Sequence, residues 1–482
     1  MTAKQPPAQH FCPHYPQPAA KRPSLLAMFL RKRRSWLDSL YERSYRMKMG
    51  EVHLPGVDVY MVNEPPLVRQ VMEQADAFPK HAMLGEALRP LLGDSIFTTN
   101  GETWRRQREL MNPSFEAARV KLVFGRMRDA ADAMVARLKA VPEGGVHDME
   151  VEMTHVAADI ILRTILSRPL ESAEALQVFR AFERYQETAP RVMMPAFFGL
   201  RWLRPWGQIR RSRQAAAEIR ALIEGLIRPR HDAYQAALHQ ATAAGTPAPT
   251  EEGGDILATL LMVRDAKTGQ GFSFEELVDQ VAMLFLAGHE TSASAMSWAL
   301  HLIANAPDVQ ERLHAEAARH LPGLGDDPGQ LKELALSRNV FRETLRLFPP
   351  VGFLARESAS TCPMRDKTVK AGASVVISPW LIQRHRELWA RPDAFDPDRY
   401  AHEEDQQPLS TKESLRKAYL PFGMGPRVCI GAAFALQEAA LVLSTVALHV
   451  RLAPVPGHVP EPVGRLTIRA ENGIALKVHQ RA

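Results

Sequence analysis

The chain has 482 residues, of which 46% are hydrophobic and 24% charged, a balance typical of a large globular protein. Its three cysteines, Cys12, Cys362 and Cys429, are too few and too scattered for a disulfide framework, which suits a reducing compartment. The net charge is +6, yet no nucleic-acid motif accompanies the basic residues. The charge therefore indicates either a solvated surface or an acidic protein partner.

The N-terminal residues 1–34 predict a flexible arm, because the first 23 of them are rich in Pro and Gln. An apolar run at 25–30 precedes four basic residues at 31–34. This pattern favours a surface helix, and it also allows weak peripheral contact with a membrane. Since the chain has no signal-peptide core and no run of about 18 apolar residues, we expect no transmembrane helix and a cytoplasmic location.

The pattern from residue 35 to about residue 243 predicts mostly helices. A charged helical pattern from residue 35 leads into an alternating segment, 49–65, whose turn at Pro55-Gly56 predicts a β-hairpin. Residues 67–243 predict helices separated by prolines. The segment 245–255, rich in Gly, Pro and Thr, is either a domain boundary or a surface loop.

A very long helix is predicted from Phe274 to Ala306, and the pattern becomes mixed beyond Pro349. Residues 369–379 predict strands, and residues 465–479 predict a β-hairpin with an Asn472-Gly473 turn. We therefore predict a mainly α fold with small peripheral β-sheets (α+β).

A short segment at 421–431 has residue types that suit a metal-bound thiolate. Cys429 precedes a long apolar helical pattern, and a thiolate is stabilised at a helix N-terminus. Gly425 and Gly431 allow the backbone to approach a flat partner, and Arg427 suits a carboxylate of that partner. Phe422 can shield the sulfur from water. A lone cysteine is more often a small buried hydrophobe, but these flanking residues favour a ligand to a planar cofactor.

The long helix contains two residues that are unusual in a helix interior. Gly288 costs roughly 1 kcal/mol relative to Ala there. Thr291 can hydrogen-bond back to a carbonyl, which bends helices. Together they predict a local widening of the helix, a feature common at functional sites. His289 and Glu290 do not form a zinc-protease motif, because Ala293 stands where the second histidine would be needed.

Two further spacings support a buried cofactor site. Glu343 and Arg346 lie three apart on one helix face, and their apolar neighbours predict that this pair is buried. Trp104 and Arg108 lie one helical turn apart, which fits either an anchored surface helix or a pair facing one ligand.

These segments, in this order, resemble the cytochrome P450 family over about residues 35–482. The resemblance implies a single catalytic domain, with haem b between the long helix and the cysteine-bearing loop and helix. Cys429 matches the axial ligand of the haem iron. The remaining matches to the haem-binding segments are Phe422, Gly425, Arg427, Gly431, Ala287 and Gly288, and the implied propionate contacts are Trp104, Arg108 and Arg356.

The resemblance also implies roles in catalysis and in structure. Glu290 and Thr291 match the pair that holds dioxygen and relays protons to it. Glu343, Arg346 and Arg399 match a buried network that fixes the cysteine loop.

The implied activity is a haem-thiolate monooxygenase that inserts one atom of O2 into an apolar organic substrate. No flavin or iron–sulfur segment is recognisable, so we expect the electrons to come from a separate ferredoxin or flavodoxin with its NAD(P)H reductase. We also expect the protein to be a monomer. The basic residues predicted to contact an acidic partner of this kind are Arg105, Arg106, Arg416 and Lys417.

Three alternatives use the same fold. A peroxygenase would carry Arg and Pro in place of Glu290 and Thr291. An isomerase or dehydratase would usually lack the threonine. A non-catalytic gas sensor or carrier would not need the acid–threonine pair.

The substrate is predicted only in outline. Val351, Gly352, Phe353 and Leu354 follow the Glu343–Arg346 helix and are expected to line the pocket. Residues 189–206, which include Met193, Met194, Phe197 and Phe198, fit an adaptable entrance region and fit ordinary packing equally well. The overall pattern is more similar to the fatty-acid and alkane hydroxylase branch, which suggests a lipid chain or a terpenoid.

Overall fold

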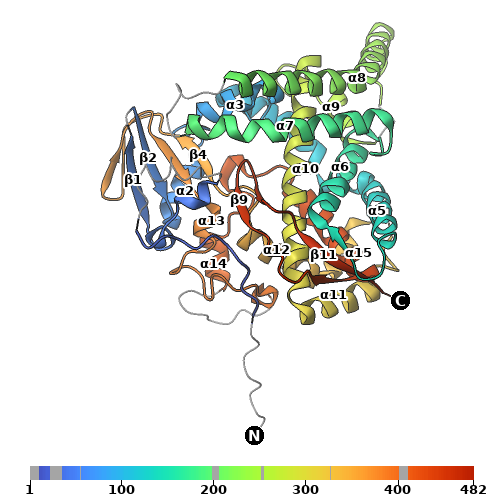
Figure 1. Ribbon diagram of the computed structural model, residues 1–482. Coiled ribbons are helices and arrows are strands. Elements are labelled where there is room, and N and C mark those ends of the chain that lie inside the picture. The colour runs from blue at the N-terminus through green and yellow to red at the C-terminus, as the bar shows by residue number, and fades with distance from the viewer. Residues whose placement is uncertain are drawn as a thin grey trace.

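The computed structural model describes residues 10–21, 35–54, 56–197, 206–250, 254–325, 327–400 and 411–481. Helices make up most of this part of the chain, and small sheets lie at its periphery (Figure 1). The prediction of a mainly helical fold with peripheral sheets is confirmed.

The helices cover the chain almost without interruption between the first hairpin and residue 347. In chain order they are α2 (Pro65–Glu73), α3 (Ala82–Leu92), α4 (Gly101–Met111), α5 (Ala117–Lys139), α6 (Met149–Leu166), α7 (Ala173–Phe197), α8 (Trp206–Ala244), α9 (Ile256–Met262), α10 (Phe274–Ala304), α11 (Pro307–His320), α12 (Ala335–Leu347), α13 (Pro379–Ile382), α14 (Thr411–Ala418) and α15 (Ala432–His449).

The strands form one four-stranded sheet and three smaller ones within the described residues. The largest has the order β1-β2-β7-β4, from β1 (Met49–Leu54), β2 (Val57–Val62), β7 (Ser374–Ile377) and β4 (Leu354–Glu357). The second has the order β3-β11-β8, from β3 (Gly145–Asp148), β11 (Ala475–Gln480) and β8 (Val450–Pro454). The two-stranded sheets pair β9 (Pro462–Gly464) with β10 (Ile468–Ala470), and β5 (Cys362–Met364) with β6 (Lys367–Val369).

The hairpin predicted at 465–479 is wrong, although its turn is present. Gly473 has the positive φ of +71° that the Asn472-Gly473 turn requires. The two flanking strands nevertheless enter different sheets, β10 beside β9 and β11 between β3 and β8. Alternation marks a segment as a strand but does not identify its partner. The helical prediction from residue 35 was also imprecise, because this segment forms two short 3₁₀ helices, Trp36–Ser39 and Glu42–Tyr45.

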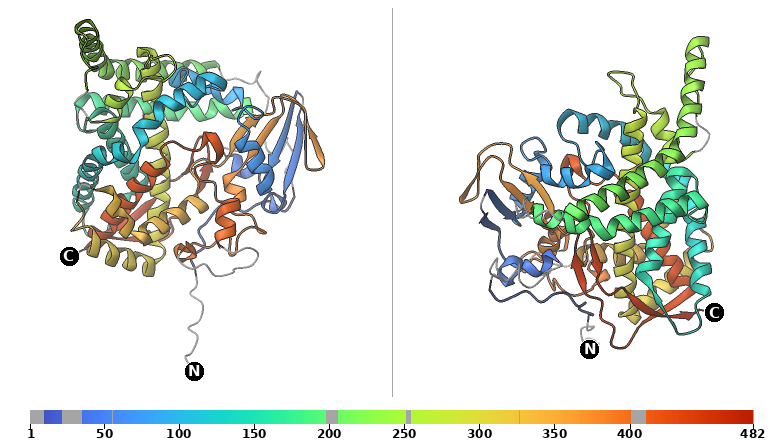
Figure 2. Two further views of the ribbon diagram at one scale, coloured as in Figure 1. Left: turned by 180° about the vertical axis from the view of Figure 1, so that it is seen from behind. Right: turned by 45° about the horizontal axis from the view of Figure 1, so that its top comes forward.

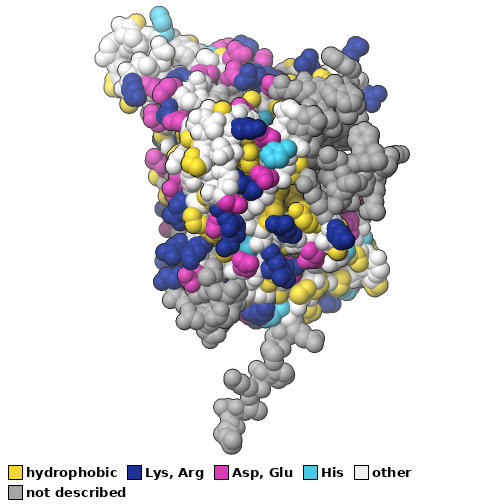
Figure 3. Space-filling view, turned by 90° about the vertical axis from the view of Figure 1, so that its left-hand side faces the viewer, with side chains coloured by type: hydrophobic (Ala, Val, Ile, Leu, Met, Phe, Trp, Pro, Cys, Tyr) yellow, Lys and Arg dark blue, Asp and Glu magenta, His cyan; other side chains and the backbone are white. Residues whose placement is uncertain are grey.

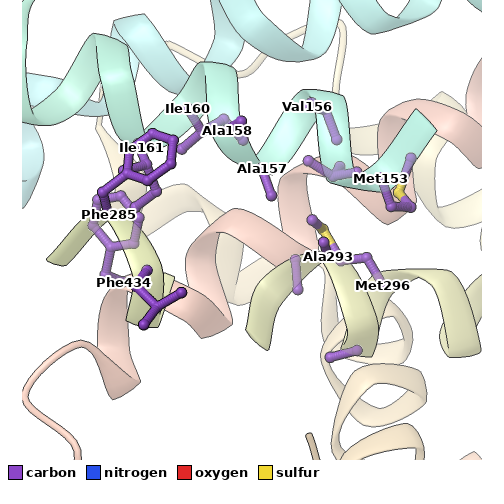
Figure 4. Packing of buried hydrophobic residues seen from close by; sticks show 14 of the residues in the cluster. Met153, Val156, Ala157, Ala158, Ile160, Ile161, Phe285, Ala293, Met296 and Phe434 are labelled. Atoms are coloured by element: carbon purple, nitrogen blue, oxygen red, sulfur yellow. The ribbon is translucent and has the colours of Figure 1, made fainter. Parts of the chain in front are cut away.

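Helix α10 is the central element of the core and packs along α6. Ser273 and Glu276 form a capping box that fixes its first turn. In Figure 4, Met153, Val156 and Ala157 of α6 face Ala293 and Met296 of α10. The main hydrophobic cluster surrounds this contact, and a second cluster lies against the β1-β2-β7-β4 sheet.

The predicted widening of α10 at Gly288 is wrong, since the helix is assigned as a continuous α-helix from Phe274 to Ala304. The glycine has a packing reason instead. A Cβ atom at Gly288 would lie 2.5 Å from Cδ1 of Ile161 on α6. The missing side chain therefore allows α6 and α10 to approach closely.

Part of the N-terminal arm packs against the body, in contrast to the predicted flexibility of residues 1–34. Tyr15 is buried against the rings of Tyr45 and Trp380. The backbone N–H of Phe395 donates to the carbonyl of Phe11 over 2.8 Å. Aromatic residues scattered among prolines supply this anchor, which a composition argument overlooks. The basic stretch at 31–34 lies outside the described residues.

The second half of α8 projects beyond the rest of the described structure (Figure 2).

Helix α15 is long and apolar enough to cross a membrane by length and composition, but 61% of it is buried in the protein core. Burial of this kind is what a core helix of a globular protein shows.

Candidate active site

The cysteine loop joins α14 to α15 and is held by backbone contacts. The N–H of Cys429 donates to the carbonyl of Phe422 over 2.9 Å, which closes the loop. Gly425 has φ +70°, and a Cβ atom there would overlap the carbonyl oxygen of Met72 at the end of α2. Gly431 is the N-cap of α15, and its N–H donates to the Cys429 sulfur. A Cβ at Gly431 would contact only Phe115, at 3.9 Å, so packing within the described chain does not explain this glycine.

The Cys429 thiol is accessible although protein surrounds it. The residue is exposed by surface area, and the dense surroundings still raise the pKa of its thiol. The Gly431 N–H and the charge of Arg108 oppose that rise. These two groups would stabilise a thiolate once a metal bound the sulfur.

Helix α10 is accessible at three positions in its middle. Every residue from Leu277 to Ala304 is buried except Ala287, Gly288 and Thr291, which are partly accessible. Ala287 and Thr291 lie one turn apart on one face, and the Thr291 hydroxyl donates to the Ala287 carbonyl over 2.6 Å. An opening halfway along a core helix is a suitable place for a ligand.

Four basic residues lie near one another without any carboxylate partner within 4.0 Å in the described chain: Lys80, Arg108, Arg356 and Arg427. Burial lowers the pKa of Arg356 and of Arg427 to about 10. Burial and the three guanidiniums lower the pKa of Lys80 well below its usual value. Such crowding is unfavourable unless an anionic group is bound among the cations.

The side-chain hydrogen bonds of these four cations go to neutral acceptors only within the described residues. Arg427 donates to the Thr99 carbonyl and to Asn100, and its guanidinium lies 4.2 Å from the centre of the Trp104 ring. Arg108 donates to the Val428 carbonyl over 2.8 Å, next to the cysteine. Their remaining donors are therefore available for a ligand. Trp104 contacts the cluster through Arg427.

The other two cations complete the cluster. Arg356 donates to its neighbouring carbonyl, Ala355, and to the Met72 sulfur. Lys80 donates to the Phe97 carbonyl over 2.8 Å. Sequence reasoning missed Lys80, because a single lysine after Phe78-Pro79 has no spacing that separates it from a surface lysine.

The predicted catalytic residues Glu290 and Thr291 are adjacent in sequence, but their side chains bond different groups. Thr291 bonds the Ala287 carbonyl, and Glu290 bonds Thr467. Oε1 of Glu290 accepts from the Thr467 hydroxyl over 2.8 Å and lies 3.9 Å from Nε of Arg469. Its Oε2 atom has no hydrogen-bond partner among the described residues. Neighbouring His289 is enclosed by the rings of Phe179, Phe182 and Phe285, and burial lowers its pKa to about 3. It is therefore neutral and adds no charge to the site.

The structure brings Glu343, Arg346 and Arg399 together in one buried network. Arg346 donates to both Glu343 oxygens, over 2.9 and 2.8 Å, and Arg399 donates over 3.3 Å. Burial alone would raise the pKa of Glu343, but the two guanidiniums lower it to about 2. Tyr400 adds a hydrogen bond of 2.9 Å that the sequence did not reveal.

Gln383 links this network to the cysteine loop, and sequence reasoning missed it as well. Its carbonyl accepts from Arg346 over 3.0 Å. Its side-chain oxygen accepts from the N–H of Leu420, just before the loop, over 2.8 Å. The buried ions thus fix the backbone that carries Cys429.

The predicted substrate pocket is only partly supported. Gly352 is buried, and a Cβ atom there would overlap the Trp36 ring, so it packs rather than faces a substrate. Val351, Phe353 and Leu354 are partly accessible. Phe353 also packs against the main hydrophobic cluster and Leu354 against the second. The side chains of Met193, Met194, Phe197 and Phe198 lie outside the described residues.

Haem fits the residues that are present. A thiol at a helix N-terminus suits an iron ligand, a glycine that packing does not explain leaves room for a flat ring, and unpaired cations suit two carboxylates. Fold and site together define a protein of the haem-thiolate class.

The comparisons with known proteins agree with this class. The chain matches the family model for cytochrome P450 over residues 16–478. The chain belongs to the cytochrome P450 family, uses haem b and is a monooxygenase.

Three of the relatives come from Streptomyces. Cyclooctatin synthase of Streptomyces melanosporofaciens is 32% identical over 87% of this chain and 86% of its own. Cyclooctat-9-en-7-ol 5-monooxygenase of the same organism is 32% identical over 84% and 83%. Pentalenene oxygenase of Streptomyces avermitilis is 28% identical over 89% and 90%. The crystal structure of the cytochrome P450DA heme domain shares the fold, with a TM-score of 0.74 over 90% of each chain and 24% identity.

Proposed function

We propose that this chain hydroxylates a terpenoid hydrocarbon skeleton at a site formed by the cysteine loop, the middle of α10 and the four-cation cluster (Lys80, Arg108, Arg356 and Arg427). The observation that carries the site is the accessible Cys429 thiol, with Arg108 of this carboxylate-free cluster beside it. The substrate class is supported by the names of the relatives, which act on cyclooctat-9-en-7-ol or are a pentalenene oxygenase.

When bound, haem with a thiolate ligand supplies the activation of dioxygen. Cys429 would bind the iron, and the Gly431 N–H would hold the sulfur in place. Lys80, Arg356 and Arg427 would neutralise the propionates and orient the ring. Thr291, accessible on α10, would hold water or dioxygen with its hydroxyl. The unpartnered Oε2 of Glu290 would accept a proton and pass it inward through water.

The spectrum of the reduced, carbon-monoxide-bound protein tests the iron ligand. We expect a strongly red-shifted Soret band in the native protein and its loss in Cys429→His. A normal band in the native protein would contradict thiolate ligation.

The substrate class is tested by the spectral shift that follows displacement of iron-bound water. We expect diterpene and sesquiterpene alcohols or hydrocarbons to produce this shift, and straight-chain fatty acids of similar carbon number to produce a smaller one. An apolar ring skeleton fits partly accessible Val351 and Phe353 without needing a cation for a carboxylate. A larger response to fatty acids would replace the terpenoid assignment with the lipid-chain alternative.

Electrons would come from a separate acidic ferredoxin or flavodoxin with its NAD(P)H reductase. Three of the four basic residues predicted to contact this partner already have acidic neighbours within the chain. Arg106 pairs with Glu276 over 2.6 Å, and Arg105 pairs with Asp76 and Glu102. Lys417 pairs with Glu413 over 3.1 Å, whereas Arg416 on α14 is exposed. Arg416 is therefore the strongest of the four candidates. A cytoplasmic monomer suits this arrangement.

A further inference from the structure

Helix α10 presents one row of side chains to strand β10. Glu290, Ser294 and Trp298 are spaced by four residues and therefore lie along one helix face. The carbonyl of Ile468 accepts from the Ser294 hydroxyl over 2.6 Å and from the Trp298 indole over 3.0 Å. In Figure 1, β9, the partner strand of β10, lies beside the middle of α10. These bonds fix the strand against the helix one turn beyond Glu290.

Strand alternation then brings two polar side chains to Glu290. Ile468 is buried in the core, and its neighbours Thr467 and Arg469 both reach the Glu290 carboxylate. Thr467 donates a direct hydrogen bond of 2.8 Å. Nε of Arg469 lies 3.9 Å from the Glu290 carboxylate, so the two groups form an ion pair without a direct hydrogen bond.

Exposure falls along this group from the surface inward. The exposed fractions are 22% for Arg469, 14% for Glu150 on α6 and 7% for Glu290. Arg469 bonds Glu150 through Nη1 over 3.1 Å, while its Nε and Nη2 have no hydrogen-bond partner among the described residues. Arg469 is also the only cation within 4.0 Å of Glu290 in that part of the chain. Thr467 and Arg469 are therefore the groups on the β10 side that contact the Glu290 carboxylate.

We propose that Arg469 and Thr467 are positioning residues that hold the Glu290 carboxylate turned toward β10, with Arg469 shared between Glu290 and Glu150. The proposal rests on the proposed role of Glu290 in proton supply. Arg469 acts through Glu290, because nothing in the structure places it against the cofactor or substrate. The polar side chains Glu150, Arg469 and Glu290 therefore lead inward on the side of α10 that faces β9 and β10.

Crystal structures of the variants test the position of Glu290 independently of turnover. We expect the native Glu290 carboxylate to lie against Thr467 and Arg469, and to leave this position in Arg469→Met. Arg469→Lys, which keeps the charge, should hold Glu290 as the native protein does. An unchanged Glu290 position in Arg469→Met would overturn the proposal.

The fraction of electrons recovered as product provides the second readout. We expect about a tenfold loss of coupling in Arg469→Met, with a matching rise in hydrogen peroxide. Thr467→Val, which removes one hydrogen bond and keeps the volume, should show a smaller loss. Combining Arg469→Met with Glu290→Gln should be no worse than Glu290→Gln alone. Additive losses would show that Arg469 acts elsewhere.

A matched control is Arg465→Met, which removes an arginine from the same segment that pairs with exposed Glu471 rather than with Glu290. It should leave the position of Glu290 and the coupling unchanged. If Glu290→Gln itself left coupling unchanged, the proton-supply role would fail, while the crystal structures would still decide whether Arg469 holds Glu290 in place.

Discussion

Single residues at this site are arranged for a ligand rather than for the stability of the empty chain. Lys80, Arg356 and Arg427 repel one another and have neutral partners only. Desolvated like charges cost free energy until an anion joins them. We therefore expect their stabilising effect to appear only with the cofactor bound.

This arrangement predicts opposite effects of Lys80→Met in the two forms of the protein. The apoprotein should become more stable to urea, because one desolvated cation is removed. The loaded protein should lose haem faster, by roughly tenfold or more, since a charged hydrogen bond contributes about 1.5–3 kcal/mol. Haem transfer to apomyoglobin measures the second effect. Exposed Lys370→Met is the control, and equal effects in both forms would contradict the interpretation.

Another single residue, Glu438, is an acid buried between α15 and α10. It is completely inaccessible, and the Ser292 hydroxyl donates to its Oε2 atom over 2.6 Å. Its Oε1 atom has no hydrogen-bond partner among the described residues. Burial raises the pKa of Glu438 to about 8, so the group is mainly neutral at pH 7.

The raised pKa of Glu438 predicts a pH-dependent stability. The folded state holds this proton more tightly than the unfolded state, whose glutamate has a pKa near 4.5. Its contribution to stability should therefore decrease between pH 4.5 and 8, by up to about 1.4 kcal/mol per pH unit. Urea unfolding of the native protein and Glu438→Gln from pH 6 to 8 should show a shallower decline in the variant. Glu413→Gln, at a half-buried glutamate in an ion pair with Lys417, should not change the slope, and parallel curves for native protein and Glu438→Gln would exclude this role.

At the scale of elements, α6 and α10 make a close contact beside the accessible middle of α10. Gly288 allows Ile161 to approach, and this contact lies one residue from accessible Ala287. Helix propensity favours alanine at position 288 by roughly 1 kcal/mol, whereas overpacking costs about 1–3 kcal/mol. Packing should therefore outweigh propensity.

We expect Gly288→Ala to destabilise the protein by about 1 kcal/mol and Ile161→Val to destabilise it by about 0.5–1.5 kcal/mol. The double variant should be more stable than the sum of the two effects, because Val lacks the Cδ1 atom that the new methyl group would meet. Urea unfolding of all four proteins gives the coupling free energy. Additive effects would show that Gly288 is not required by this contact.

At the scale of the whole molecule, the net charge of +6 does not produce a purely basic surface on the face that carries the largest sheet. On the face that carries the β1–β2 strands, basic and acidic side chains are intermixed (Figure 3). Three of the four basic residues predicted to contact a redox partner are already in ion pairs. Recognition of an acidic partner would then depend on a few exposed charges near the cysteine loop.

We expect the rate of reduction by an acidic ferredoxin to fall as ionic strength rises, because attraction between exposed charges is screened over about 10 Å at 0.1 M salt. Arg416→Glu should slow the reaction at low salt and weaken its salt dependence. Exposed Arg451→Glu on β8 makes the same change of net charge away from α14 and should have a smaller effect. Rates that do not respond to salt would argue against electrostatic docking.

The sequence by itself determined the features that depend on local spacing. The long helix, the cysteine between glycines and the Glu343–Arg346 pair were identifiable because each is set by residues a few positions apart. The family resemblance supplied the cofactor and the type of reaction, since those motifs occur in a fixed order.

Only the tertiary structure decided contacts between distant segments. Lys80 joins the cation cluster, Gln383 links the buried ions to the cysteine loop, and β10 meets Glu290 rather than pairing with β11. None of these contacts leaves a periodic pattern in the chain, because each depends on where two separately folded segments meet. The physical reason is that local spacing encodes which face of an element is apolar, while long-range packing selects what lies against it.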